Sequence, residues 1–177
     1  MDLKDALIHD RSKANMQAIS AWIGQEEDRF AQLWELVRTG ADPMPQRASW
    51  AMSHCYSLHP TVVHAFIPEM AAFLFETKIE SVQRNIVRIL SKGPLDGIEN
   101  DGNLYELCLG WLRSEKTAIA IRIWSMDVAA RIAEPYPELR EEVRYHIETI
   151  LPHGSAGFKS RSKKILKRFT KLSSAQS

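Results

Sequence analysis

The segment ADPMPQRASWAMSHCYSLHP, residues 41–60, decides the fold of this chain. It opens with the acid Asp42 and two prolines, which suit a turn and the start of a helix, because proline lacks the N–H that a helix interior needs. Arg47 and small residues follow, and the next turn signal is His59–Pro60. The segment therefore predicts a turn and then a helix over 45–58.

Helical spacing of apolar residues continues outward from this segment. Leu104, Leu107, Cys108, Trp111 and Leu112 fall on one stripe of a helix, and no stretch alternates as a half-buried strand would. The spacing predicts further helices over 13–23, 26–38, 61–76, 79–91, 101–113, 116–133, 138–151 and 156–171, with a short one near 2–8. Because Pro68 falls inside 61–76, we expect that helix to be kinked there or to start late.

Two columns of residues repeat with one period. The first consists of Arg47, Arg84, Arg122 and Arg161, at spacings of 37, 38 and 39 residues. The second consists of Trp34, Met70, Leu107 and Val143, at spacings of 36, 37 and 36 residues. A period of roughly 40 residues that carries two helices is typical of an α-solenoid. We therefore expect an all-α protein, an α-α superhelix of roughly four to five helix pairs that forms a single domain over 1–177.

The segment 41–60 resembles a HEAT repeat, with its turn acid, proline, and arginine opening the second helix. The whole chain resembles small bacterial HEAT-like proteins through QRASWAMS (46–53), AIRIWSMDVAA (120–130) and AGFKSRSKKILKRF (156–169). This resemblance implies a HEAT-like repeat solenoid and no particular chemistry. Members sometimes carry an adenylosuccinate lyase label, but this chain is far shorter than that enzyme and lacks its serine-rich signature loop.

The net charge of +1 hides an asymmetry between the body and the C-terminal segment. Of 23 basic residues, seven lie between Lys159 and Lys171 with no acid among them, which leaves 16 basic and 22 acidic residues in 1–158. Such a segment either attracts an anionic partner or keeps an end helix solvated. We predict a basic capping helix at about 156–171.

No catalytic or cofactor motif is present in the sequence. Glycine-rich phosphate loops, a nucleophile elbow and the H-E-x-x-H zinc motif are all absent. The only cluster of potential metal ligands is His54, Cys55, His59 and His64, but adjacent helical residues point about 100° apart and Pro60 interrupts the path. The sequence favours a protein without metal, cofactor or enzymatic activity.

The sequence also suggests a cytoplasmic protein. Cys55 and Cys108 match no zinc, redox or disulfide pattern, which favours a reducing compartment. The N-terminal residues MDLKDALIHDRSK contain no apolar core of a signal peptide, and no apolar run approaches the ~20 residues that span a bilayer.

The leading functional hypothesis is a non-enzymatic scaffold module that binds a protein or peptide on the concave face of the superhelix. The candidate binding residues are Arg47, Trp50, Arg84, Arg122, Trp124, Arg161, Lys163, Lys164, Lys167 and Arg168. The arginines either hold the turns together, through carbonyls or a turn acid such as Asp42, or form a phosphate track. Most of the five tryptophans fall on apolar stripes and are expected in the core. Trp50 and Trp124 are set apart because they follow Arg47 and Arg122 by three and two residues.

The alternative hypothesis is a nucleic-acid-binding HEAT-like protein, prompted by the arginine column and the basic C-terminal helix. HEAT-like alkylpurine DNA glycosylases use aromatic and acidic residues on such a curve, and the resemblance to them is one of fold.

Overall fold

The computed structural model describes residues 1–175, and within them it contains eleven α-helices, one 3-10 turn and no strand. The all-α prediction is thereby confirmed. No helix in this part of the chain is long and apolar enough to cross a membrane. The chain divides into two compact units, Met1–Ile98 and Glu99–Ser177, referred to below as unit 1 and unit 2. A single domain over 1–177 stays a prediction.

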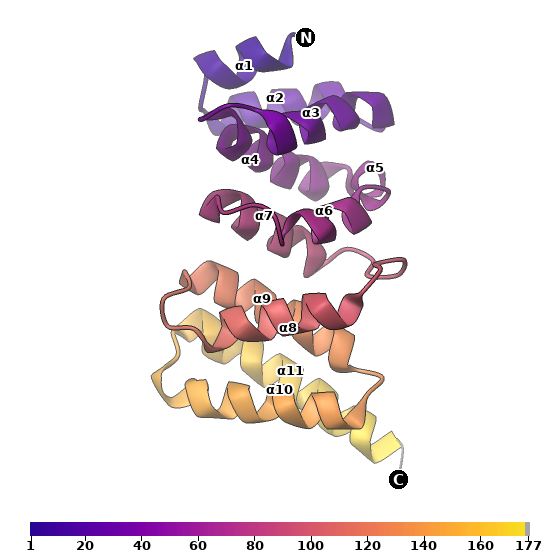
Figure 1. Cartoon of the computed structure of the whole chain (residues 1–177), viewed down its shortest axis with the longest axis vertical. Coiled ribbons are helices and arrows are strands. Elements are labelled where there is room, and N and C mark those ends of the chain that lie inside the picture. Colours follow the sequence, from indigo (N-terminus) through magenta and orange to yellow (C-terminus); the bar gives the residue numbers. More distant parts are fainter. Residues whose placement is uncertain (176–177) are drawn as a thin grey trace. The chain divides into compact units, whose positions relative to one another are not determined.

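Unit 1 is built from consecutive antiparallel helices, shown in indigo to magenta in Figure 1. The helices are α1 (Leu3–His9), α2 (Lys13–Ile23), α3 (Glu27–Thr39), α4 (Met44–Leu58), α5 (Pro60–His64), α6 (Ile67–Phe73) and α7 (Glu80–Leu90). The pairs are α1 with α2, α3 with α4, and the broken helix α5–α6 with α7. The second helices pack on one another, with α4 between α2 and α7. We call the surface of α2, α4 and α7 the second-helix face.

Unit 2 contains two further helix pairs, shown in red to yellow in Figure 1. Its elements are α8 (Asp101–Arg113), α9 (Ile119–Ala133), α10 (Pro137–Ile150), the 3-10 turn η1 (Leu151–His153) and α11 (Ala156–Ala175). The helix predicted over 156–171 begins where expected and continues to Ala175. Phe158 and Phe169 of α11 are fully buried and anchor it to the rest of the unit.

The helix predicted over 61–76 is broken into α5 and α6, because Pro68 cannot lie in a helix interior. A continuous helix would place the Pro68 ring against the carbonyl of His64 and would lose one backbone hydrogen bond. The chain instead ends α5 at His64 and restarts at Ile67. Pro68 thus lies in the first turn of α6, where a missing N–H costs nothing.

Side-chain hydrogen bonds between equivalent helices recur at the repeat period. Six of them join residues 35 to 37 positions apart, each inside one unit. In unit 1, for example, Asn85 Nδ2 donates to Ser49 Oγ at 3.0 Å, and Arg88 Nη1 donates to Ser53 Oγ at 3.0 Å. In unit 2, Tyr105 Oη donates to Glu142 Oε2 at 2.7 Å. The period read from the sequence is therefore also the period of the polar contacts.

The apolar stripe of α8 differs from the predicted one. Leu104, Cys108 and Leu112 are buried as expected, but Tyr105 and Leu109 are buried in place of Leu107 and Trp111, which are only partly covered. Both α9 and α10 pack against α8, so the buried arc is set by two neighbours rather than by the apolar residues alone.

Candidate anion-binding cavity

The second-helix face of unit 1 contains a cavity of about 220 Å³. Its lining residues are Arg11, Met16, Gln46, Arg47, Trp50, Ser81, Arg84 and Asn85. Three of these eight residues are arginines and none is an acid, so we call it the arginine cavity. It brings together three of the candidate binding residues, Arg47, Trp50 and Arg84, from α4 and α7.

Arg11 joins the cavity although the sequence reading missed it. It lies in the segment between α1 and α2, 36 residues before Arg47. The arginine column therefore extends one period further toward the N-terminus than we predicted. The spacing of 36 residues from Arg11 to Arg47 already indicated this extension. It was overlooked because α1 is too short to mark a first helix pair clearly.

Arg47 holds the end of α1 in place. Its Nη1 donates to the carbonyl oxygens of Leu7 at 2.9 Å and Ile8 at 2.7 Å, two groups that a helix end leaves without intrahelical partners. Of the two roles considered for the arginines, Arg47 therefore has the structural one, in which the guanidinium bonds to backbone carbonyls. Asp42 accepts a hydrogen bond from Gln46 instead of from Arg47. The Nε and Nη2 groups of Arg47 have no partner within residues 1–175, so one edge of a fixed guanidinium remains available.

Arg84 and Arg11 are both exposed, and among residues 1–175 neither has a hydrogen-bond or ion-pair partner. Glu80, four residues before Arg84 on α7, forms no ion pair within residues 1–175, and the acids next to Arg11 and Arg47 in the sequence are engaged elsewhere. Asp10 accepts from the backbone N and the Oγ of Ser12 at 2.6 and 2.9 Å, and Asp42 accepts from Gln46. Within the described residues, no ion pair therefore neutralises an arginine of the cavity.

The floor of the cavity is rigid because α4 and α7 are bonded beneath it. Asn85, which is 4% exposed, donates to Ser49 Oγ, and Ser49 Oγ donates to the Gln46 carbonyl at 2.9 Å. Two buried polar atoms of the lining, Gln46 Oε1 and Ser81 Oγ, have no hydrogen-bond partner within residues 1–175. A buried polar group without a partner is costly, so these atoms favour a ligand or water that bonds to them.

Trp50 forms an apolar wall of the cavity. Its ring lies edge-on to His54, with the ring centroids 5.6 Å apart. Burial, together with the charges of Lys13 and Arg88, lowers the pKa of His54, so this imidazole is neutral near pH 7. Trp50 is thus supported by a neutral ring.

The candidate arginines of unit 2 have partners within that unit. Arg122 Nε donates to the Leu112 carbonyl at 3.1 Å. Arg161 Nη1 lies 3.1 Å from Asp127 Oδ2, and its guanidinium stacks over Trp124 at 4.9 Å. Arg168 Nε lies 2.8 Å from Glu134 Oε1.

Three candidate lysines of α11 differ from these arginines. Lys163, Lys164 and Lys167 are exposed, and no ion pair involves them in the described part of the chain.

Only Trp34 meets the expectation that the tryptophans lie in the core. It is 3% exposed, and its Nε1 donates to Glu69 Oε2 at 2.8 Å. The other tryptophans, Trp22, Trp50, Trp111 and Trp124, are partly covered. For Trp22 and Trp111 the prediction is wrong, whereas Trp50 and Trp124 are the two tryptophans named above as candidate binding residues.

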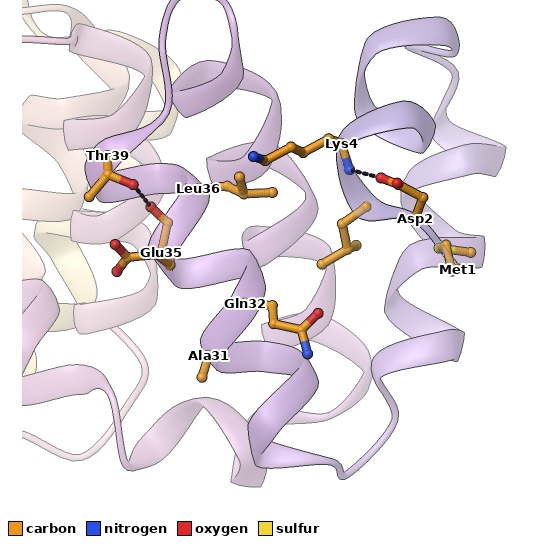
Figure 2. Close-up of a pocket in the computed structure, with 9 residues that line it drawn as sticks. Met1, Asp2, Lys4, Ala31, Gln32, Glu35, Leu36 and Thr39 are labelled. Carbon is orange, nitrogen blue, oxygen red and sulfur yellow. Dashed lines mark hydrogen bonds between the residues drawn. The ribbon is translucent and has the colours of Figure 1, made fainter.

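A second, larger hollow lies between α1 and α3, with a volume of about 670 Å³. Figure 2 shows Lys4 reaching from α1 toward Leu36 of α3, with Asp2 and Glu35 also on its rim. Asp2 is occupied as the cap of α1, since its Oδ1 accepts from the backbone N–H of Lys4 and Asp5. The mixed charges around this hollow select no class of ligand.

The potential metal ligands His54, Cys55, His59 and His64 do not form a metal-binding group in the described residues. Within residues 1–175, no three histidine, cysteine or acidic side chains could hold a metal ion together. Cys55 is buried and donates to Ser20 Oγ at 3.4 Å, and His64 lies against the ring of Tyr56. Each of these side chains packs between helices.

A family model described as a HEAT repeat domain matches residues 3–169. The match confirms the resemblance to HEAT repeats and the repeat architecture inferred from the sequence. No curated protein and no solved structure matches the chain.

Proposed function

The chain belongs to the HEAT repeat family, and on that premise we propose that it is an interaction module that binds an acidic segment of another protein. We place the binding surface on the second-helix face of unit 1, as the concave face of that unit's own helix stack. The observation that supports this proposal is the arginine cavity, in which three arginines meet without an acid. Charge complementarity of this kind selects the partner and speeds association.

The size of the cavity favours a side chain of a partner over a free small molecule. Pockets for drug-sized ligands and cofactors have volumes of about 300–1,000 Å³. The arginine cavity, at about 220 Å³, lies below that range and suits one or two side chains of a bound segment. Trp50 gives the segment an apolar contact beside the charges.

A selection from a random peptide library on the immobilised protein tests this proposal. We expect enrichment of Asp- and Glu-containing peptides, whose affinity falls as the salt concentration rises. Arg84→Glu should weaken the selected peptides at least tenfold. Lys78→Glu is the matched control, because it makes the same charge change at an exposed position of unit 1 outside the cavity. If the selected peptides bind Arg84→Glu and Lys78→Glu with equal affinity, the proposal is wrong.

Nucleic-acid binding is the second candidate, and the exposed lysines of α11 favour it. Against it, Arg161 and Arg168 are paired with Asp127 and Glu134, whereas phosphate-backbone binding needs a series of available cations. Joint replacement of Lys163, Lys164, Lys167 and Arg168 by alanine, followed by measurement of DNA affinity, tests this candidate. Unchanged DNA affinity and an unchanged salt slope would remove this candidate.

Purification of the tagged protein with and without nuclease separates the two classes of partner. The proposed function requires a stoichiometric protein partner that survives nuclease treatment and is lost in the Arg84→Glu variant.

A further inference from the structure

We propose that the arginine cavity receives a phosphorylated side chain of the partner segment. This inference rests on the proposed function and specifies the chemistry of the ligand. It follows from three properties of the cavity: the excess of hydrogen-bond donors, the uncompensated charge and the preorganisation of Arg47.

The cavity offers many donors and few acceptors. A guanidinium only donates, and three of them line the cavity. The hydroxyl of Ser81 is buried without a partner within residues 1–175, and the indole N–H of Trp50 is a further donor of the lining. Gln46 Oε1 is a buried acceptor without a partner within residues 1–175, whereas the Ser81 hydroxyl can either donate or accept. A ligand that matches this set presents several acceptor oxygens at its tip, and its backbone N–H can serve Gln46.

The charge of the cavity exceeds what one carboxylate compensates. Arg11, Arg47 and Arg84 have no acidic partner in the described chain, whereas Arg161 in unit 2 has Asp127 and Arg168 has Glu134. A phosphate monoester carries a charge of about −1.5 to −2 near pH 7 and three strong acceptor oxygens. It therefore engages more than one guanidinium at a time, and arginine is the side chain best suited to bind it by two parallel hydrogen bonds.

Arg47 is held in place before the ligand arrives. The Leu7 and Ile8 carbonyls fix its Nη1, so the free edge of the guanidinium loses little entropy on binding. The bonded floor of Asn85, Ser49 and Gln46 fixes the distance between α4 and α7. Arg84 and Arg11 are exposed lining residues, so their side chains can move to contact the ligand.

The observations favour a single phosphoryl group over a nucleic-acid strand. The cavity accommodates one group, and in unit 2 the corresponding arginines of the column are bonded to Leu112 and Asp127. A polynucleotide would need such cations to remain available along its path. The partly exposed Trp50 instead suits the apolar stem of one side chain.

The test uses four peptide libraries with the same randomised flanks and a central phosphoserine, phosphotyrosine, glutamate or serine. Fluorescence anisotropy measures their binding to the full chain, and inorganic phosphate and a single-stranded oligonucleotide serve as further probes. We expect at least one phosphorylated library to bind tenfold or more tightly than the glutamate library. Comparison of the phosphoserine library with the phosphotyrosine library shows whether the cavity prefers a short side chain or an aromatic one.

Variants tie the binding to the cavity. Arg84→Ala should weaken the phosphorylated library at least tenfold, and Lys78→Ala should leave it unchanged. In NMR spectra the indole N–H signal of Trp50, assigned by its loss in Trp50→Phe, should shift with the phosphopeptide. This readout reports contact at the cavity even where affinity is weak.

Each remaining outcome overturns the inference in its own way. Equal binding of the glutamate and phosphorylated libraries shows that a carboxylate suffices, so the inference fails while the proposed function stands. Equal affinity for inorganic phosphate and for phosphopeptides shows an ion site without a peptide. Binding of the oligonucleotide alone, or of no acidic library at all, removes both the inference and the proposed function.

Discussion

Replacement of Arg47 by alanine should loosen α1 and lower the stability of unit 1. The change removes two charge-assisted hydrogen bonds, to the carbonyl oxygens of Leu7 at 2.9 Å and Ile8 at 2.7 Å. Such bonds to charged groups contribute about 1.5–3 kcal/mol each when buried. The bond to Ile8 is exposed and the bond to Leu7 partly buried, so water replaces much of the loss. We expect a total cost of about 1–2 kcal/mol.

Thermal unfolding measured by circular dichroism or calorimetry detects a change of this size. For a chain of this length, 1 kcal/mol corresponds to a change in Tm of about 2–4 °C, so Arg47→Ala should lower Tm by about 2–8 °C. Hydrogen exchange should show the loss of protection first in α1, because the lost bonds hold only that helix to α4.

Arg84→Ala is the matched control for this variant. It removes the same charge from the same cavity and the same position of the repeat, but Arg84 has no partner among residues 1–175. Its cost should stay below about 0.5 kcal/mol. If both variants lose the same stability, or if α1 keeps its protection in Arg47→Ala, the structural role assigned to Arg47 is refuted.

Three further predictions concern other buried groups. Tyr105→Phe should cost about 1 kcal/mol in urea unfolding, since it removes the 2.7 Å bond to Glu142. Burial, reinforced by Glu142, raises the pKa of Tyr105, so the folded state holds this proton more tightly than the unfolded state does. The stability of the wild type should therefore fall above about pH 10, and more steeply than the stability of Tyr105→Phe. A pH-stability curve identical for both proteins would contradict this. Burial raises the thiol pKa to about 11 for Cys55 and about 12 for Cys108, so neither should react with a thiol reagent at pH 8 until the protein unfolds. Rapid labelling of the folded protein would disprove their burial. Burial first, then Lys13 and Arg88, lowers the pKa of His54, so stability should be lost as the pH falls below the ordinary value of 6.5. The loss between pH 7 and 5 should be shallower in His54→Gln, and an unchanged slope would contradict the assignment.

The candidate site was only partly predictable from the sequence. The column of Arg47 and Arg84 follows from spacing alone, and it does bring two arginines to one cavity. Arg11 could have been added from the same spacing. Gln46 and Ser81 carry no sequence signal, because their importance depends on burial without a partner. Such a property belongs to the packed helices and not to the residue types.

The sequence by itself determined the period, the helix class and most helix ends. These features are local: prolines and glycines stop helices, and apolar spacing of 3.6 residues defines their faces within a few turns. The break at Pro68 and the start of α11 at Ala156 are of this kind.

Only the tertiary structure decided which arginines remain available to a ligand. Arg47 and Arg84 occupy equivalent positions in the sequence repeat, yet one is fixed by carbonyls about 40 positions away and the other has no partner in residues 1–175. Arg161 is neutralised by Asp127, which lies one repeat earlier in the chain. The physical reason is that a side chain finds its partner across the packed helices, where direction and distance depend on the neighbouring helix pair.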